Sequence, residues 1–175
     1  DPGAGAGAPA PAAPAPPAAY VPTTAVGDSV MVGAAPVLAE RLGPALTVDA
    51  EVGRQMEDAV AVVRDLAGAG RLGEVVVLHL GNNGPFDGAL LDEVLATIGP
   101  DRKVLLVTVA VPRRWEGEVN QQLAAAAERH ANVVLLDWRA LATTEAGLTR
   151  EDGYHLTAAG AQRYADLVVG QVPQA

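Results

Sequence analysis

Short runs of β-branched and aliphatic residues alternate with longer segments of helical periodicity along most of the chain. Because parallel strands need a crossover connection between them, this alternation predicts a three-layer α/β/α domain with a parallel sheet. The middle runs are apolar at successive positions, as expected for strands covered on both faces. The five predicted strands are Thr24–Val26, Leu46–Val48, Glu74–Leu80, Lys103–Val109 and Asn132–Leu136.

The segments between these runs have the spacing of amphipathic helices. In the clearest case, apolar residues recur every three or four positions from Met56 to Ala67, and Gly68 and Gly70 follow as a stop signal. Functional residues in such folds lie at the carboxyl ends of the strands, so the residues just after each strand deserve most weight. The other predicted helices are Gly33–Leu42, Asp87–Ile98, Trp115–His130 and Thr157–Val169.

The N-terminal segment has a different composition from the rest of the chain. Of the first 25 residues, 20 are Ala, Pro or Gly, and residues 1–22 hold seven of the thirteen prolines. We expect residues 1–22 to form an extended or disordered tether and residues 23–175 to form one domain. A terminus without any role fits the composition equally well. The chain begins with Asp1 and shows no signal-peptide pattern, which suggests a piece of a longer protein.

Charge and cysteine content narrow the classes of function. The chain has 12 Lys and Arg against 21 Asp and Glu, a net charge of −9, and no basic block, which argues against nucleic acid as a partner. Cysteine is absent, which excludes thiol catalysis, Cys-ligated metals and disulfides. No apolar run reaches the roughly 18 residues of a membrane span. We predict no metal site and no cofactor.

A serine and two carboxamides follow the first and third predicted strands. Gly27-Asp28-Ser29 comes directly after the first strand, although this tripeptide alone is more often a turn or a helix cap. Leu80-Gly81-Asn82-Asn83-Gly84 closes the third strand. An Asn-Gly pair usually marks a hairpin, but no antiparallel strand pattern follows this one. We therefore expect the carboxamides to have another role at the same edge as Ser29.

A second pair of polar residues precedes the predicted C-terminal helix. Asp152 and His155 are three residues apart, and Thr157 is a plausible cap for the helix that follows. An Asp beside a His holds the imidazole in one tautomer and stabilises the imidazolium, which is what a serine nucleophile needs from its base. On its own such a pair is more often part of a surface loop. The sequence does not show that His155 meets Ser29.

Together these residues resemble the four blocks of the SGNH/GDSL hydrolases. The blocks are Gly27-Asp28-Ser29, Gly53, Gly81-x-Asn83 and Asp152-x-x-His155, in that order. The resemblance covers roughly residues 24 to 170, and the ordered set is much more specific than any single block. It implies a flavodoxin-like fold. Within this superfamily the chain is similar to the extracytoplasmic domain of bacterial peptidoglycan O-acetyltransferases. The matching segments are 27–33, 52–55, 81–84, 111–116, 119–120 and 152–157.

The resemblance implies a role for each residue of the motifs. Ser29 would be the nucleophile, His155 its base, and Asp152 the group that orients His155. The backbone N–H groups of Ser29 and Gly53 and the side-chain amide of Asn83 would form the oxyanion hole. A hydroxyl needs such a base near neutral pH, and the charge of a tetrahedral intermediate needs such donors.

The neighbours of the predicted oxyanion hole differ from the usual pattern or have more than one interpretation. Many SGNH enzymes carry Asp after the Asn of their third block, whereas this chain has Gly84. This changes the surroundings of the oxyanion site without removing its donor. Arg54 and Gln55 flank Gly53, where a cap or a salt bridge is as good an interpretation as a contact with substrate.

The same resemblance implies a substrate and a cellular setting. In that family an integral-membrane acyltransferase domain passes an acetyl group outward, and a tethered SGNH domain places it on a muramic acid 6-hydroxyl of peptidoglycan. The expected partners are the glycan strand, an acetyl donor and an N-terminal membrane domain, at the extracytoplasmic face of the bacterial membrane. Two alternatives remain, a carbohydrate or peptidoglycan O-acetylesterase with the same residues and a non-catalytic glycan-binding domain.

Other polar residues carry weaker signals. Arg113, Arg114 and Trp115 follow the fourth predicted strand and are candidates for a glycan groove, although Trp115 equally fits a packed residue at a helix start. His79 lies within the third predicted strand, where a hydrogen-bonded structural histidine is the more common finding. Asp137 follows the fifth strand and is a rival to Asp152, but no His lies near it in the sequence.

Overall fold

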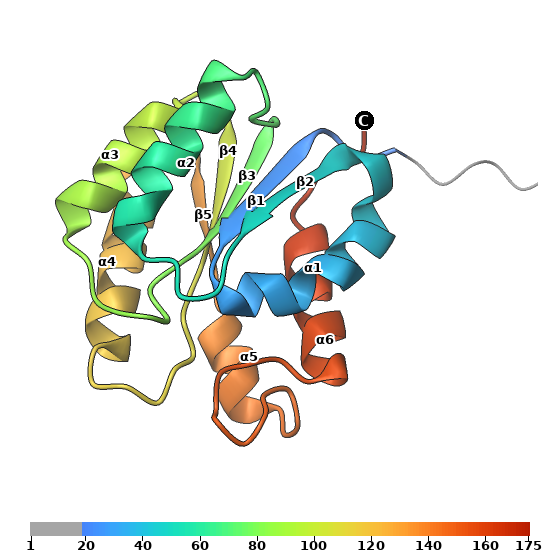
Figure 1. Ribbon diagram of the computed structural model, residues 1–175, viewed down its shortest axis with the longest axis vertical. Coiled ribbons are helices and arrows are strands. Elements are labelled where there is room, and N and C mark those ends of the chain that lie inside the picture. The colour runs from blue at the N-terminus through green and yellow to red at the C-terminus, as the bar shows by residue number, and fades with distance from the viewer. Residues whose placement is uncertain (1–18) are drawn as a thin grey trace, which may run out of the picture.

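The computed structural model describes residues 19–175 and contains one five-stranded parallel sheet with the strand order β2-β1-β3-β4-β5. The predicted fold class is therefore confirmed (Figure 1). Each strand lies within two residues of its predicted position at both ends. The strands are β1 (Thr23–Gly27), β2 (Leu46–Ala50), β3 (Val75–His79), β4 (Lys103–Val107) and β5 (Val133–Leu136).

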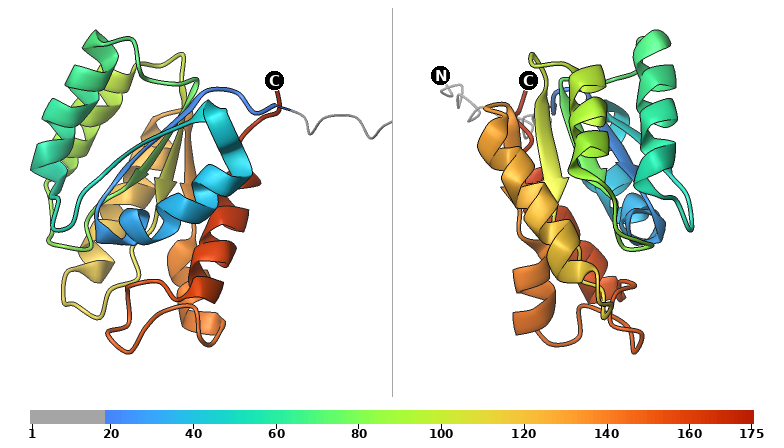
Figure 2. Two further views of the ribbon diagram at one scale, coloured as in Figure 1. Left: turned by 45° about the vertical axis from the view of Figure 1, so that its right-hand side comes forward. Right: turned by 90° about the vertical axis from the view of Figure 1, so that its left-hand side faces the viewer.

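Helices cover both faces of the sheet (Figures 1 and 2). On one face, α2, α3 and α4 contribute to one hydrophobic cluster, and on the other α1, α5 and α6 contribute to a second. The sheet separates the clusters, which gives the three expected layers. The helices are α1 (Ser29–Leu42), α2 (Met56–Gly68), α3 (Gly88–Ile98), α4 (Glu116–Arg129), α5 (Trp138–Thr144) and α6 (Ala158–Val169), with a 3-10 turn at Gly43–Ala45.

The continuous apolar runs of the central strands follow from this sandwiching. All five residues of β3 are buried, and its side chains alternate between the two clusters. Val76 and Leu78 pack under α2 and α3, whereas Val75 and Val77 pack under α1 and α6. Burying a Val or Leu side chain in this way contributes about 1.5–3 kcal/mol, so both faces stabilise the sheet.

Two helices differ from the prediction. The first begins at Ser29 rather than at Gly33, because the Asp28 carboxylate accepts a hydrogen bond from the N–H of Val30 at 3.0 Å and caps the helix. The Gly-Asp-Ser segment is therefore both a turn and a helix start. The short helix α5 was not predicted. It begins after Asp137, whose carboxylate accepts from the N–H of Ala140 at 2.9 Å.

Residues near the two ends of the described chain lie side by side. Tyr20 and Gln174 form an antiparallel bridge, and the N–H of Val21 donates to the carbonyl of Pro173 at 3.1 Å. The last four residues of the predicted tether, 19–22, thus contact the domain. The remainder of that segment, residues 1–18, lies outside the described residues. Within residues 19–175, no helix combines the length and the apolar character needed to cross a membrane.

Candidate active site

The strand register brings three polar loops to one edge of the sheet. Gly27 at the end of β1 pairs with Ala50 of β2 on one side and with His79 of β3 on the other. The loops that follow these strands carry Ser29, Gly53 and the Asn82-Asn83 pair. The predicted site residues of all three loops therefore lie beyond neighbouring carboxyl ends, as expected for this fold.

The turn that carries Ser29 is tightly packed. A Cβ atom on Gly27 would collide with the Cβ of Met31, so only glycine allows the helix to begin this close to the strand. Asp28 is fully buried and caps the helix, while Ser29 is its first residue and is partly exposed. The turn thus presents the Ser29 hydroxyl at the end of β1 on a rigid support.

Ser29, His155 and Asp152 form one hydrogen-bonded chain. The Nε2 atom of His155 lies 3.0 Å from the Ser29 Oγ, and its Nδ1 atom lies 2.9 Å from Asp152 Oδ2. With the carboxylate ionised, Nδ1 carries the proton and donates to Asp152, which leaves Nε2 to accept from the serine hydroxyl. Ser29 is therefore brought together with the distant Asp152 and His155, in the order that a nucleophile, a base and an orienting acid require.

The loop around Asp152 holds its carboxylate ionised. Partial burial raises the pKa of Asp152, but hydrogen bonds from the Tyr154 N–H, the His155 side chain and the His155 N–H outweigh it and lower the pKa to about 2. Both N–H groups lie 3.0 Å from Asp152 Oδ1. Gly153 has a φ of +84°, which favours glycine at this point of the turn. Asp152 is thus an anion throughout the neutral range.

The residues predicted for the oxyanion hole lie in adjacent loops. Gly53 has a φ of +82°, and a Cβ atom built there meets no atom within 4 Å, so the glycine is required by its backbone conformation and faces open space. Asn83 is partly exposed, and its Nδ2 donates to the carbonyl of Arg54 at 3.2 Å. One of the two amide protons of Asn83 is engaged in this bond.

Asn82, in contrast, belongs to a buried series of hydrogen-bonded side chains. Its Nδ2 lies 3.0 Å from Asp28 Oδ2 and 3.4 Å from His79 Nε2, and the Nδ1 of His79 lies 3.0 Å from the hydroxyl of Tyr164. Burial lowers the pKa of His79, with a smaller opposing effect from Asp28, so the ring is neutral. His79 is therefore a hydrogen-bonded structural histidine, as predicted. These hydrogen bonds link Tyr164 of α6 to Asp28, the residue before Ser29. The sequence did not reveal this role of Tyr164.

Comparisons with known proteins show what the chain is similar to. No family model matches the chain. It is 38% identical over 146 residues to the peptidoglycan O-acetyltransferase OatA of Listeria monocytogenes, and 37% identical over 145 residues to the O-acetyltransferase OatA of Staphylococcus aureus. These matches cover 83% and 82% of the chain, which spans about a quarter of the length of either relative (23% and 24%).

Solved structures place the fold. The C-terminal catalytic domain of Streptococcus pneumoniae OatA, solved with a methylsulfonyl adduct, superposes with a TM-score of 0.75 at 22% identity and covers 90% of this chain and 98% of that one. A Veillonella parvula protein of the lipolytic G-D-S-L family gives a TM-score of 0.65 at 16% identity, over 84% of this chain and 96% of that one. The chain therefore has the fold of these two proteins.

The predicted groove residues have different environments. Arg113 is exposed, and the only hydrogen bond of its side chain in the described part of the chain runs from Nη1 to the adjacent carbonyl of Pro112 at 3.3 Å. Trp115 is half-buried against the core, and its indole N–H donates to the carbonyl of Gly81 at 3.1 Å. Trp115 therefore supports the loop before Asn82, whereas Arg113 faces solvent. Arg114 is also exposed.

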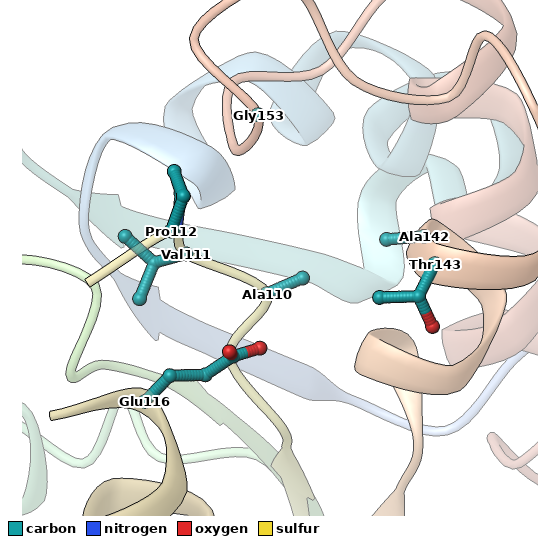
Figure 3. Close-up of a pocket in the computed structure, with 7 residues that line it drawn as sticks. All are labelled: Ala110, Val111, Pro112, Glu116, Ala142, Thr143 and Gly153. Atoms are coloured by element: carbon teal, nitrogen blue, oxygen red, sulfur yellow. The ribbon is translucent and has the colours of Figure 1, made fainter. Parts of the chain in front are cut away.

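A small pocket lies beside the loop that carries Asp152 and His155, on the side of α5. It has a volume of about 180 Å³ and includes Gly153, the residue between Asp152 and Tyr154. Figure 3 shows the Glu116 carboxylate and the side chains of Pro112 and Ala142 around it. Its lining residues are Ala110, Val111, Pro112, Glu116, Ala142, Thr143 and Gly153.

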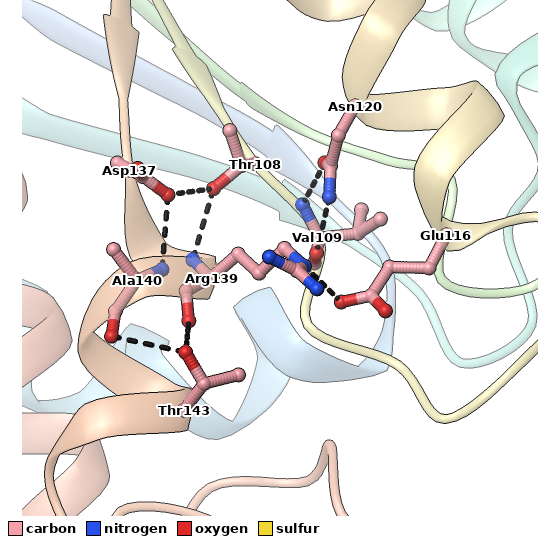
Figure 4. A network of polar contacts seen from close by, with 8 residues as sticks. All are labelled: Thr108, Val109, Glu116, Asn120, Asp137, Arg139, Ala140 and Thr143. Atoms are coloured by element: carbon pink, nitrogen blue, oxygen red, sulfur yellow. Dashed lines mark hydrogen bonds and ion pairs between the residues drawn. The ribbon is translucent and has the colours of Figure 1, made fainter.

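Asp137 makes hydrogen bonds that hold neighbouring elements together. Its Oδ1 accepts from the Thr108 hydroxyl at 3.1 Å and from the N–H of Ala140 at 2.9 Å, and Glu116 pairs with Arg139 nearby (Figure 4). No histidine ring contacts it among the described residues. Asp152, the predicted partner of His155, makes that contact instead.

Proposed function

We propose that the chain is a serine-dependent O-acetyltransferase domain that transfers acetyl groups onto peptidoglycan muramic acid hydroxyls through an acetyl-serine intermediate. The Ser29–His155–Asp152 chain is the observation that carries this proposal, since its geometry suits acyl transfer. The peptidoglycan acceptor is supported by the relatives, which are named as peptidoglycan O-acetyltransferases.

The first half-reaction forms the acetyl-enzyme. His155 Nε2 takes the proton from Ser29 while Oγ bonds to the acetyl carbonyl carbon, and the carbonyl oxygen becomes an oxyanion. The N–H groups of Ser29 and Gly53 and the Asn83 amide are the proposed donors to this oxyanion. The bond to the donor group then breaks, and His155 returns its proton to the leaving oxygen.

The second half-reaction transfers the acetyl group. A sugar hydroxyl gives its proton to His155 Nε2 and attacks the acetyl-serine carbonyl, and the same donors stabilise the second oxyanion. Collapse of this intermediate releases the acetylated sugar, and the proton returns to the Ser29 Oγ. The ionised Asp152 stabilises the imidazolium in both halves.

The acceptor is proposed to lie along the loop that follows β4. Arg113 is exposed beside the pocket lined by Pro112, Glu116 and Gly153, and Gly153 belongs to the loop that carries Asp152 and His155. A carboxylate can accept from sugar hydroxyls, and the apolar wall suits the carbon face of a ring. This placement brings an acceptor hydroxyl toward the His155 side of Ser29.

The setting of the whole protein is also a proposal. The chain spans about a quarter of its relatives' length, 23% for the Listeria protein. We infer that it is the extracytoplasmic part of a longer, membrane-tethered protein. Residues 1–22 would form the tether, and an integral-membrane domain would precede them and deliver the acetyl group.

A serine-directed reagent tests the proposal directly. Ser29 is the only serine among the 175 residues, so a phosphonate or sulfonyl fluoride that labels a serine must label Ser29. We expect stoichiometric labelling of the wild-type chain and none of a folded Ser29→Ala variant. That variant should lose turnover of simple acetyl esters by up to about a millionfold. A chain that does not label would instead be a non-catalytic glycan-binding domain.

A further inference from the structure

The loops that carry Gly53 and Asn83 are joined by two reciprocal hydrogen bonds. The Nδ2 of Asn83 donates to the carbonyl of Arg54 at 3.2 Å, and the Nε2 of Gln55 donates to the carbonyl of Asn83 at 3.3 Å. Each loop therefore supplies one donor and one acceptor to the other. Gly53 directly precedes Arg54, so the pair of bonds lies beside two of the three proposed oxyanion donors, those of Gly53 and Asn83. We call these two bonds the cross-loop brace.

The brace is anchored on the side of β2 by a buried arginine. The side chain of Arg54 is 6% exposed, and its Nη2 pairs with Asp49 Oδ1 at 2.7 Å. Its Nη1 donates to the Asp49 carbonyl at 2.6 Å and to the Gly27 carbonyl at 3.4 Å. Gly27 lies two residues before Ser29, so the same guanidinium contacts the ends of both β1 and β2. The backbone that the brace holds is thus fixed relative to the nucleophile turn.

Gln55 is anchored on the other side by the helix it begins. It is the N-cap residue of α2, and its own N–H donates to the carboxylate of Asp58 at 2.9 Å. The backbone of Gln55 cannot move without disturbing the first turn of α2. Its side chain reaches from this fixed point across to the carbonyl of Asn83 in the neighbouring loop.

Gly84 has no side chain, and this leaves room for the side chain of Gln55. A Cβ atom on Gly84 would lie 3.1 Å from Gln55 Oε1, closer than ordinary van der Waals contact. The φ of Gly84 is not positive, so its conformation does not by itself require glycine. Gln55 and Gly84 are therefore sterically coupled. This coupling gives a physical reason for glycine at a position where many SGNH enzymes have Asp.

We propose that Gln55 is a positioning residue, which acts through Asn83 to hold the oxyanion donors in place. The inference rests on the proposed function, because it requires Asn83 to stabilise an oxyanion. Stabilisation of that kind depends on donors fixed in advance at hydrogen-bond distance, and supporting contacts decide whether they are. A Gln55 side chain that holds the carbonyl of Asn83 limits how far the Asn83 amide can move.

The test is a double-mutant cycle on Gln55→Ala and Gly84→Ala, with an activated acetyl ester as substrate. Rates are normalised to the amount of Ser29 labelled by a phosphonate, which removes any unfolded fraction. We expect Gln55→Ala to lower kcat about tenfold with little change in KM, since misplacement by about 1 Å can cost up to a hundredfold. Gly84→Ala should lower kcat several-fold. The double variant should be no worse than Gln55→Ala alone, because both changes disturb one contact.

Matched measurements separate positioning from stability. Gln121→Ala removes an exposed glutamine of α4 and should keep the wild-type kcat. The pH at which kcat is half-maximal should not move in any variant, since the brace does not contact His155. A wild-type kcat for Gln55→Ala, or additive losses in the double variant, would overturn the inference if Asn83→Ala still lowered kcat by about a hundredfold or more. Full activity of Asn83→Ala would instead remove the oxyanion assignment on which it rests.

Discussion

Asn82 and Asn83 are adjacent in the sequence, yet their side chains have different partners. Asn83 is partly exposed beside Gly53's loop, whereas Asn82 is buried and donates to the Asp28 carboxylate at 3.0 Å. We expect Asn83→Ala to lower kcat by about a hundred- to a thousandfold, the usual loss for one oxyanion donor. KM and the unfolding midpoint should change little. Steady-state kinetics on an acetyl ester and a thermal melt measure both.

Asn82→Ala is the matched control for that prediction. It removes a side-chain hydrogen bond to the buried carboxylate of Asp28, which costs about 1–3 kcal/mol of unfolding free energy. We expect a lower unfolding midpoint and only an indirect effect on kcat. A larger loss of kcat in Asn82→Ala than in Asn83→Ala, at equal folded fraction, would reverse the assignment of the two carboxamides.

The low pKa of Asp152 leads to a prediction for the effect of acid on the stability of the loop that carries Asp152 and His155. Its pKa in the folded chain is about 2, below the ordinary value of 3.8, because backbone and imidazole hydrogen bonds outweigh the cost of burial. A carboxyl whose pKa is lowered by folding contributes stability above its unfolded pKa, and the contribution is lost as pH falls through the folded value. The stability difference between wild type and Asp152→Asn should therefore shrink between about pH 4 and pH 2.

Urea unfolding of the wild type and of Asp152→Asn at several pH values measures how their stability difference changes with pH. Asp152 is partly exposed, so the difference at neutral pH should be modest. At neutral pH the variant should also be a much slower esterase, because its His155 lacks the anion that stabilises the imidazolium. A stability difference that grows as the pH falls would contradict the role of the backbone hydrogen bonds.

Residues in sequence motifs were predictable, and residues that act through contacts were not. Ser29, Asp152 and His155 follow from the type and order of their motifs, and the structure places them within hydrogen-bond distance. The contact of Gln55 with Asn83 depends on how two loops meet after the sheet has formed. The sequence offered two equal interpretations of Gln55, and nothing in its neighbours indicates the distance to Asn83.

At the scale of elements, α5 is the part of the fold that the sequence did not predict. It has seven residues, too few to show helical periodicity, and its start depends on the Asp137 cap. The five strands were predicted because their apolar runs are continuous. The start of α1 was misplaced by four residues, because Gly33 looked like a boundary while Asp28 is the cap. Capping geometry decides helix starts, and sequence patterns locate them only approximately.

The Asp137 cap gives a prediction for α5. Asp137→Ala removes the acceptor for the Ala140 N–H and for the Thr108 hydroxyl, and loss of such a cap costs about 1 kcal/mol of unfolding free energy. We expect a lower denaturation midpoint with kcat on an acetyl ester close to wild type. Equilibrium unfolding and kinetics on one preparation measure the two effects. A severe loss of kcat at full stability would restore Asp137 as a rival to Asp152.

At the scale of the whole molecule, the site combines parts from distant stretches of the chain. The proposed nucleophile follows β1, the proposed oxyanion donors Gly53 and Asn83 follow β2 and β3, the proposed acceptor loop follows β4, and the proposed base precedes α6. A parallel sheet brings these parts together because all its strands end at one edge. Each loop can then change without altering the layers beneath it, so transferases and esterases can share one fold.

The last prediction concerns the fate of the acetyl-enzyme, where transferase and esterase differ. A transferase must hold a sugar hydroxyl near the acylated Ser29, and such positioning can be worth several kcal/mol, whereas water needs no pocket. We expect the domain, given an activated acetyl donor and muramic-acid-containing oligosaccharides, to form acetylated glycan above the level of continuing hydrolysis. Mass spectrometry of the glycan and release of free acetate measure the two products.

Arg113→Ala tests whether the loop after β4 binds that acceptor. Arg113 is exposed and has no side-chain partner beyond its neighbour's carbonyl in the described residues, so its removal should spare the fold, whereas Trp115 also supports the Gly81 carbonyl. We expect the ratio of acetylated glycan to free acetate to fall several-fold, with ester hydrolysis unchanged. Arg64→Ala, which removes an equal charge from a surface ion pair of α2 with Glu93, should leave the ratio as it is. If no donor yields acetylated glycan while acetylated peptidoglycan is readily deacetylated, the domain is an esterase, because its acetyl-serine then reacts with water alone.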